Sequence, residues 1–290
     1  MGNEVLKKAR ENKNDEFYTL YEDIENELNH YKDLVKGKSI YCPADTLKSN
    51  FWKFFYNNFN ELGITKLTIT GLNSKLYSTN DGAAIEEKEL ETNGDFLNDE
   101  ILEIMRAHDI IITNPPFSLL CEFIKKLCEN KIYFLLVGNE NCYDNTRVFP
   151  YILTNEVKVG FTKPRNFITP DGTYQRLGNI QWITNLSIVK ENQLKLSKTY
   201  SETEYKQYDN YEAINVDRVA DIPIDYEGVM GVPITYISKH NPSIFKILGN
   251  TKRTMHGIVP YIEGFKDHGG NGMVEGKLKY SRIFIQRIQT

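Results

Sequence analysis

The sequence predicts an α/β protein: a doubly wound, mostly parallel sheet with a smaller, irregular, β-containing C-terminal domain. Through about residue 190, apolar runs typical of strands buried on both faces alternate with amphipathic helical stretches. Residues 191–227 are polar and rich in tyrosine and asparagine, and residues 228–290 carry short β-like runs between glycine and proline turns. We therefore expect two domains, residues 1–190 and residues 191–290.

Helices and strands alternate from the start of the chain. Residues 19–35 predict a helix that ends at Gly37, residues 39–42 predict a strand, and Ser49 caps a second helix that ends at Gly63. The apolar faces of these helices are Leu20, Ile24, Leu28, Tyr31 and Val35, and then Phe51, Phe55, Phe59 and Leu62.

The middle of the chain continues this alternation. Strands are predicted at residues 66–70, 109–113 and 131–138, and helices at residues 98–107 and 118–130. In such sheets ligands bind at the carboxyl ends of the strands. The chemistry should therefore lie in the segments that follow Cys42, Thr70 and Thr113.

The composition is that of an ordinary globular protein. Hydrophobic residues make up 40% of the 290 residues and charged residues 26%, which excludes a largely disordered or fibrous chain. No apolar run reaches the roughly 18 residues that a membrane helix needs, and the N-terminus has no apolar signal core. The four cysteines lack C-x-x-C spacing, so we expect reduced thiols, a cytoplasmic location and no membrane association.

The net charge of −4 is divided unevenly. Residues 1–150 hold 17 Lys and Arg against 25 Asp and Glu, whereas residues 151–290 hold 18 against 14. This asymmetry is expected where one part of a protein meets a polyanion and the other does not. Chance clustering explains the same counts equally well.

The sequence Asn114-Pro115-Pro116-Phe117 directly follows a predicted strand. The two prolines fix the backbone and remove two N–H donors, which leaves a stiff turn with carbonyls free to accept hydrogen bonds. The Asn114 amide oxygen and the Pro115 carbonyl can accept both hydrogens of one exocyclic amine, and Phe117 offers a flat face for a base. An N-P-P-F turn can also simply end a strand, but its place at a carboxyl end favours a site for an extruded adenine.

Four stretches of the chain resemble the EcoRI family of adenine-specific DNA methyltransferases, which use S-adenosylmethionine. They are DEFYT at residues 15–19, GDF at 94–96, NPPF at 114–117, and GVMGVPIT at 228–235 with Asn241 and Pro242 following. The resemblance implies a Rossmann-like methyltransferase fold, with S-adenosylmethionine and catalysis in residues 1–190 and target-DNA recognition in residues 191–290. It also implies a monomer that methylates N6 of adenine in double-stranded DNA, in restriction-modification or in DNA protection of a phage or host.

The resemblance implies roles for individual residues. Asn114, Pro115, Pro116 and Phe117 would form the catalytic set that holds and activates the target amine. The residues expected to bind the cofactor are Phe17 and Thr19 at its methionine part, Asp45 at its ammonium group, and Asp95 and Phe96 at its adenine ring. Asp45 as a turn residue, Asp95 as a helix-cap acid and Phe17 as a core residue are the alternatives.

The chain also departs from the usual pattern of cofactor sites. No G-x-G-x-x-G loop follows the first strand, and no acidic residue follows the second strand to bind the ribose, which leaves Asn73 as the candidate. The five histidines show no paired spacing, so we expect no metal site and nominate no general base.

DNA contact is expected from the C-terminal domain. The basic residues selected there are Lys252, Arg253, Lys279 and Arg282, followed by Lys277 and Arg287; for each, a solvated surface residue is the alternative. Trp182 resembles a family segment near the target base, and a core tryptophan is its alternative. Two other functions stay open: a methyltransferase acting on RNA or protein glutamine, and a catalytically decayed DNA-binding module.

Overall fold

The computed structural model describes residues 17–169, 171–188, 194–251 and 271–288, and the chain divides into two compact units. Unit 1 consists of Met1–Glu140 and Val159–Ser187, and unit 2 consists of Asn141–Lys158 and Ile188–Thr290. Within the described residues, no helix combines the length and the apolar character needed to cross a membrane.

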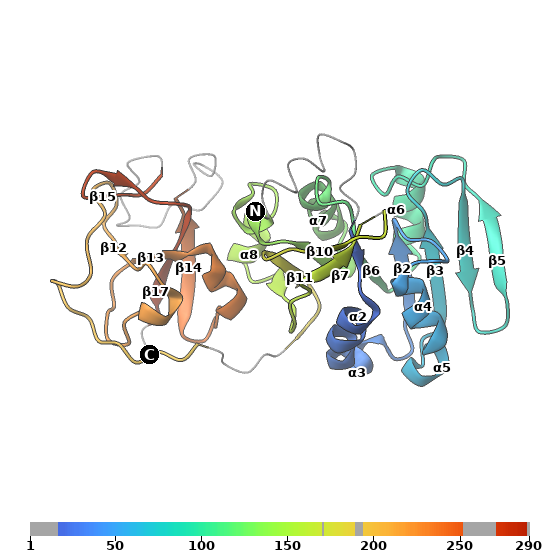
Figure 1. Cartoon of the computed structure of the whole chain (residues 1–290), viewed down its shortest axis with the longest axis horizontal. Helices are drawn as coiled ribbons and strands as arrows, with labels where there is room; N and C mark the ends of the chain where they lie inside the picture. The colour runs from blue at the N-terminus through green and yellow to red at the C-terminus, as the bar shows by residue number, and fades with distance from the viewer. Residues whose placement is uncertain (1–16, 170, 189–193, 252–270, 289–290) are drawn as a thin grey trace. The chain divides into compact units, whose positions relative to one another are not determined.

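An eight-stranded sheet forms the centre of unit 1, in the order β5-β4-β3-β2-β6-β7-β11-β8 (Figure 1). Its strands are β2 (Ser39–Pro43), β3 (Lys66–Thr70), β4 (Leu76–Asn80), β5 (Ile85–Glu89), β6 (Ile110–Thr113), β7 (Tyr133–Asn139), β8 (Lys158–Val159) and β11 (Ile180–Thr184). The strands β3, β2, β6 and β7 run parallel, whereas β4, β5 and β11 run antiparallel to their neighbours.

The sheet is therefore mixed rather than mostly parallel, which corrects part of the sequence prediction. The class, mixed α/β, is as predicted, and parallel pairing holds for the four central strands. The short turn between β4 and β5 cannot hold the crossover that a parallel connection requires, so these strands form a hairpin. The hairpin went unpredicted because every residue of β5 is exposed and gives no apolar pattern.

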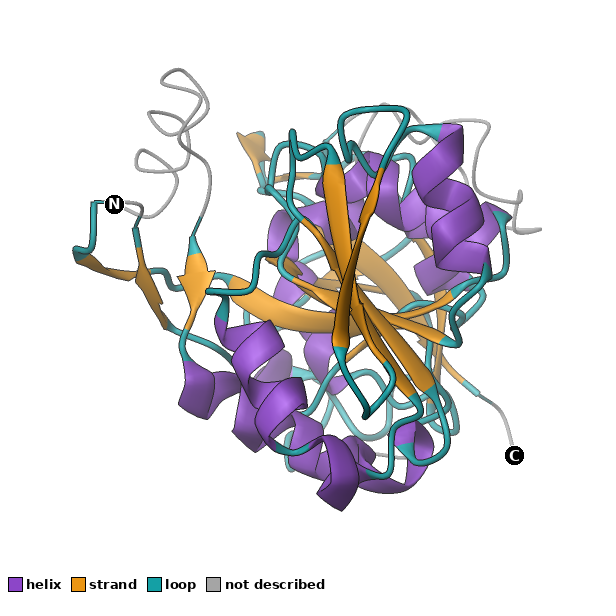
Figure 2. Cartoon of the chain, turned by 90° about the vertical axis from the view of Figure 1, so that its right-hand side faces the viewer, coloured by secondary structure: helices purple, strands orange, loops and turns teal. Residues whose placement is uncertain are grey.

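Helices lie on both faces of this sheet (Figure 2). They are α2 (Tyr21–Leu28), η1 (Asn29–Tyr31), α3 (Lys32–Val35), α4 (Asn50–Asn57), α5 (Phe59–Leu62), α6 (Asp99–Arg106) and α7 (Leu120–Glu129). The predicted helices are confirmed to within two residues at their ends. Ser49 caps α4 as expected, because its hydroxyl accepts from the Trp52 N–H at 3.1 Å, and Gly63 ends α5 with a φ of 63°.

A small antiparallel sheet of unit 1 orders its strands β1-β9-β10, which are β1 (Tyr18–Thr19), β9 (Asn166–Ile168) and β10 (Tyr174–Arg176). Tyr18 and Tyr174 both pair with Ile168, so these three residues form one row across the sheet. Strands of two or three residues are too short to show alternation, and the sequence did not predict this sheet.

Unit 2 contains a four-stranded sheet in the order β12-β13-β17-β14 and a hairpin of β15 and β16. Its elements are α8 (Phe149–Leu153), β12 (Ile214–Asn215), η3 (Val219–Asp221), β13 (Met230–Pro233), η4 (Ile234–Lys239), β14 (Phe245–Asn250), β15 (Met273–Val274), β16 (Lys277–Leu278) and β17 (Arg282–Arg287), with η2 (Glu140–Asp144) at the boundary. Tyr208, Tyr211 and Phe284 pack together in its core. Irregular segments connect these short strands.

Candidate functional site

The carboxyl ends of β2 and β6 lie side by side, because these two strands are parallel neighbours. The chain runs from β2 to β3 on one side and returns to β6 on the other, and ligands bind at such a reversal of strand order. Asp45 follows β2 and Asn114 follows β6. Thr113 joins the two loops, since its Oγ1 lies 2.8 Å from Asp45 Oδ2 and within hydrogen-bonding distance of the Pro43 carbonyl oxygen.

A pocket opens at this place. Six of the residues predicted to bind the cofactor or to catalyse line it: Phe17, Thr19, Asp45, Asn114, Pro115 and Pro116. Its remaining walls come from Tyr18, Ala44, Ser49, Asn50, Phe51 and Leu72, for which the sequence predicted no role in the site. The pocket thus brings together four parts of the chain: residues 17–19, 44–51, 72 and 114–116.

The side chain of Asn114 is held in one orientation. Its amide nitrogen Nδ2 donates to the carbonyl oxygen of Phe17. A carbonyl oxygen only accepts, so the NH₂ end of the amide must face Phe17. This leaves the amide oxygen of Asn114 to accept a hydrogen bond from another group.

Aromatic packing fixes the backbone of Phe17. Its ring stacks on Phe117, with 5.8 Å between ring centroids and 17° between the planes, and meets the edge of Phe167 at 6.4 Å. Both Phe17 and Phe117 are buried. The neighbouring Thr19 carbonyl accepts from Asn50 Nδ2 at 2.9 Å, so residues 17–19 are fastened at both ends.

Asp45 is buried beside this motif, and burial raises the pKa of its carboxyl to about 7. Hydrogen bonds from the side chains of Thr113 and Ser49 oppose this rise by favouring the charged form. Burial also raises the pKa of the adjacent Cys42 thiol, which keeps it neutral. A cationic ligand group in the pocket would complete the pairing of the Asp45 carboxylate.

Asp95 and Phe96 do not line the pocket. Phe96 is fully buried and packs against Phe123 at 4.3 Å between centroids, and the Asp95 side chain accepts from the Leu97 N–H at 2.9 Å. Gly94 brings this segment against the end of β3, because a Cβ there would lie 2.5 Å from the Gly71 carbonyl oxygen. Their predicted contact with the adenine of the cofactor stays a prediction.

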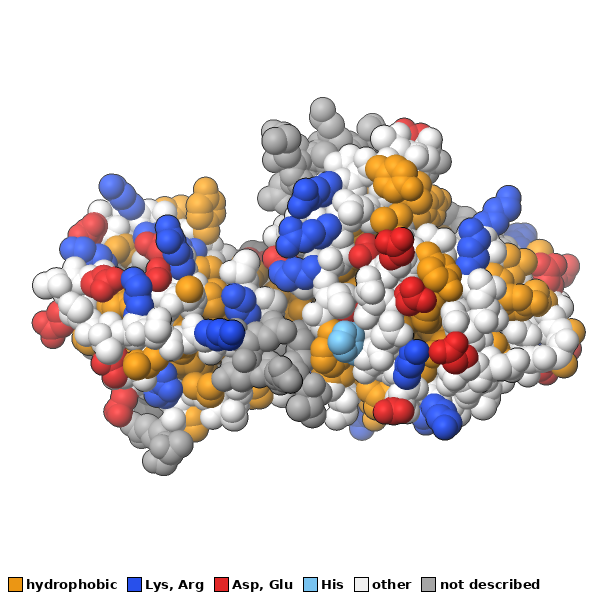
Figure 3. All heavy atoms as spheres, turned by 60° about the horizontal axis from the view of Figure 1, so that its bottom comes forward, with side chains coloured by type: hydrophobic (Ala, Val, Ile, Leu, Met, Phe, Trp, Pro, Cys, Tyr) orange, Lys and Arg blue, Asp and Glu red, His pale blue; other side chains and the backbone are white. Residues whose placement is uncertain are grey.

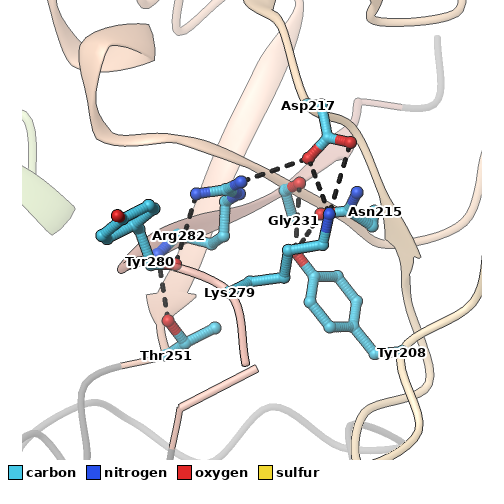
Figure 4. Close-up of polar contacts among 8 residues, drawn as sticks. All are labelled: Tyr208, Asn215, Asp217, Gly231, Thr251, Lys279, Tyr280 and Arg282. Carbon is cyan, nitrogen blue, oxygen red and sulfur yellow. Dashed lines mark hydrogen bonds and ion pairs between the residues drawn. The ribbon is translucent and has the colours of Figure 1, made fainter. Parts of the chain in front are cut away.

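Two of the predicted DNA contacts in unit 2 pair with the same acid (Figure 4). Lys279 Nζ lies 3.2 Å from Asp217 Oδ1, and Arg282, which is 8% exposed, reaches the same oxygen at 3.3 Å. Lys252 and Arg253 lie outside the described residues. On the face of unit 2 that Figure 3 shows, basic and acidic side chains are interspersed among the described residues.

Trp182 lies on β11 and is fully buried. It pairs with Val137 across the sheet and meets the edge of Phe51 at 6.1 Å. In this structure its indole presents no surface to a nucleic acid.

The sequence missed three polar residues of the site. Thr113 is the last residue of β6, and Asn50 is the first residue of α4. Ser49 was predicted only as the cap of this helix. Their position at the carboxyl edge was the available signal. Within the described residues, no group of three His, Cys, Asp or Glu side chains could hold a metal ion.

Comparisons with known proteins match this chain along nearly its full length. The family described as "Adenine-specific methyltransferase EcoRI" matches residues 5–81 and 72–288. Type II methyltransferase M.EcoRI of Escherichia coli is 36% identical to this chain, and the match covers 98% of this chain and 96% of the relative. M.MpnI of Mycoplasma pneumoniae is 34% identical and M.MgeORF184P of Mycoplasma genitalium is 32% identical; each of these matches covers 97% of this chain and 98% of the relative. No solved structure matches. The chain belongs to the EcoRI family of adenine-specific methyltransferases.

Proposed function

We propose that this protein is a site-specific DNA methyltransferase that moves a methyl group from S-adenosylmethionine to N6 of an extruded adenine, as part of restriction-modification or DNA protection. Its family and its Type II relatives support adenine-specific methylation of DNA. One observation supports the site: a single pocket joins the oriented amide of Asn114 to the buried carboxyl of Asp45.

The residues of the pocket fit the methionine part of S-adenosylmethionine. Asp45 would pair with the ammonium group. The Oγ1 atom of Thr19 is buried and has no hydrogen-bond partner among the described residues, so a polar ligand group would satisfy it. The bound cofactor supplies a methyl group already activated by a positive sulfur. We further infer that β3, β2, β6 and β7 with their helices form a Rossmann-like core.

Asn114 and Pro115 would act on the target amine. The amide oxygen of Asn114 and the carbonyl of Pro115 accept its two hydrogens, which leaves the nitrogen lone pair free for attack. As positive charge develops on this nitrogen, the same two oxygens stabilise it without reorganising. Their fixed geometry also holds the amine in place for transfer. The proton then leaves to water.

Phe117 is the predicted stacking face for the base. In this structure Phe17 covers one of its faces at near-parallel orientation. A base that stacks on Phe117 must therefore displace Phe17 or use the opposite face. Extrusion of the adenine from the duplex is required in either case.

The experiment is transfer of labelled methyl from S-adenosylmethionine to unmodified genomic DNA, followed by nucleoside analysis. We expect N6-methyladenine from the wild type. Asn114→Ala should lower turnover about 100- to 1,000-fold, because it removes one of two charge-stabilising acceptors, with cofactor affinity within threefold. Asn60→Ala, an exposed position on α5, is the matched control and should retain wild-type turnover.

Near-normal turnover of Asn114→Ala would contradict the assigned mechanism. RNA and glutamine-containing peptides in the same assay test the other acceptors, and preferential transfer to either would replace DNA as the substrate. Binding of DNA without any binding of S-adenosylmethionine would instead indicate a decayed methyltransferase.

A further inference from the structure

The small sheet β1-β9-β10 has one face with buried side chains and one with exposed side chains. Thr19, Phe167 and Gln175 form one row, in which Thr19 and Phe167 are buried. Tyr18, Ile168 and Tyr174 form the next row, and side chains of successive rows point to opposite faces. Tyr18 is 46% exposed and Tyr174 is 71% exposed, so this second row lies on the outer face.

The outer face combines exposed rings with a cation. Asn166 and Arg176 pair two residues along the strands from the Ile168–Tyr174 pair, so they share its face, and both are exposed. Exposed tyrosine rings can stack on bases without sequence preference. Arginine binds phosphate through two parallel N–H bonds.

The charge of this region differs from that of the rest of unit 1. Residues 161–180 hold three cations, Lys163, Arg165 and Arg176, against one carboxylate, Asp171. Lys163 pairs with Glu140 at 3.0 Å. The Asp171 side chain accepts a hydrogen bond from the Thr173 N–H at 3.1 Å, within the turn between β9 and β10. Among the residues that the structure describes, no carboxylate lies within ion-pair distance of Arg165 or Arg176.

The segment that leads into β9 is firmly anchored. The buried carboxylate of Glu27 accepts from the backbone N–H of Phe161 at 2.8 Å and of Thr162 at 2.6 Å. Gly160 permits this approach, because a Cβ there would lie 2.2 Å from Glu27 Oε1. A surface held in place before binding loses little conformational entropy when a ligand docks.

This surface also touches the site through β1. Phe17, which precedes Tyr18, carries the carbonyl that orients Asn114. A ligand strand on the outer face would therefore lie against the element that supports the catalytic amide. A polyanion with planar bases fits Arg176 and the exposed tyrosines together, whereas an apolar protein partner would leave Arg176 without an anion.

We propose that the outer face formed by Tyr18, Ile168, Tyr174, Asn166 and Arg176 binds the backbone of double-stranded DNA beside the extruded adenine. This inference rests on the proposed function. It adds a contact on the catalytic unit, outside the C-terminal region from which DNA binding was expected.

The test compares Arg176→Gln and Tyr174→Ala with wild type in binding of a labelled, mixed-sequence duplex of about 30 base pairs across a salt series. Arg176→Gln should weaken binding at least threefold and reduce the slope of log K against log salt by about one. Arg176→Lys should keep the slope, because its charge is retained. Tyr174→Ala should weaken binding about fivefold or more with an unchanged slope.

Lys131→Gln and Tyr133→Ala are matched controls, because both positions are exposed and lie at the opposite, amino end of β7. They should bind the duplex as the wild type does, and all variants should bind S-adenosylmethionine normally by calorimetry. Wild-type binding and slope in both hairpin variants would overturn this inference alone. A wild type that neither binds the duplex nor methylates DNA would overturn the proposed function. Tighter, Arg176-dependent binding of an RNA duplex would overturn the assignment to DNA.

Discussion

The two units use their polar residues in different ways. In unit 2, Lys279 and Arg282 share Asp217, and Lys198 pairs with Glu204 at 2.8 Å and with Asp221 at 3.3 Å. In the pocket of unit 1, the hydroxyl of Thr19 has no partner among the described residues and the Asp45 carboxyl has no cation.

The difference shows that a count of charged residues indicates which region could bind a ligand. Which side chains in that region are available for binding depends on the ion pairs and hydrogen bonds that they already make. The C-terminal excess of basic residues indicated a polyanion contact, yet two described members of the predicted set, Lys279 and Arg282, pair with Asp217. Arg176 on β10 and Arg165 just before β9 have no acidic partner among the residues that the structure describes. We therefore expect substitutions in unit 1 to change chemistry and ligand affinity, and substitutions in unit 2 to change mainly stability.

Among the further substitutions, Asn114→Asp should have the largest effect. Its carboxylate would face the Phe17 carbonyl, which can only accept, so the charged form is repelled there and the pKa of the new carboxyl is raised. The protonated form can donate to Phe17 and still accept from the amine. At saturating cofactor we expect turnover about 100-fold below wild type at pH 8, with the deficit shrinking as the pH falls toward 6.

The measurement is the ratio of single-turnover rates, variant to wild type, across this pH range. Division by the wild-type rate removes effects of other titrating groups. A ratio that does not change with pH would show that the Phe17 carbonyl does not orient this amide.

The second effect is on cofactor affinity. Wild-type affinity for S-adenosylmethionine should rise from about pH 6 to pH 7.5, because Asp45 loses its proton near pH 7 while the amino group of the ligand stays protonated to about pH 8. Asp45→Asn should weaken binding about tenfold at pH 7.5 and remove most of this rise. Calorimetry with Asp81→Asn, an exposed position in the β4–β5 turn, as control tests both statements. Equal pH dependence in both variants would exclude Asp45 as the partner of the ammonium group.

The sequence predicted the parallel core of unit 1 because each of its strands is a short apolar run. It missed β5, which is exposed, and the sheet β1-β9-β10, whose strands are too short for a pattern. Thr19 does not belong to the helix predicted at residues 19–35. It lies in β1, because its backbone pairs with Phe167 of β9.

For the candidate site, the position after the parallel strands, together with the family resemblance, led to the prediction of Asp45 and Asn114, and both line the pocket. The contact between Asn114 and Phe17 was not predictable, because a backbone carbonyl has no signature in the sequence and the two residues are 97 positions apart. The same limit applies to pairing: nothing in the residue types around Lys279 and Arg282 showed that both would meet Asp217.

A third effect should appear in the stability of unit 2. Arg282→Met removes a buried guanidinium that contacts Asp217 and the Tyr280 carbonyl at 3.3 Å each. The Tyr280 carbonyl loses this donor, and Asp217 keeps only Lys279 as a cationic partner among the described residues. We expect a loss of about 1–3 kcal/mol in unfolding free energy, with cofactor affinity unchanged. Denaturant titration with parallel calorimetry measures both quantities. Unchanged stability together with weaker DNA binding would restore Arg282 as a DNA contact.

The smallest effect is expected for Lys279→Gln. Its partner Asp217 has a side chain 59% exposed, and such ion pairs contribute about 0–1 kcal/mol. Should Lys279 contact a phosphate, it must first leave Asp217. Its loss should therefore weaken duplex binding less than the loss of Arg176, which pairs with no acid in the described part of the chain. Salt-dependent binding of both variants in one series compares them directly. A larger change in slope for Lys279→Gln than for Arg176→Gln would show that pairing in the free protein does not decide which cations meet DNA.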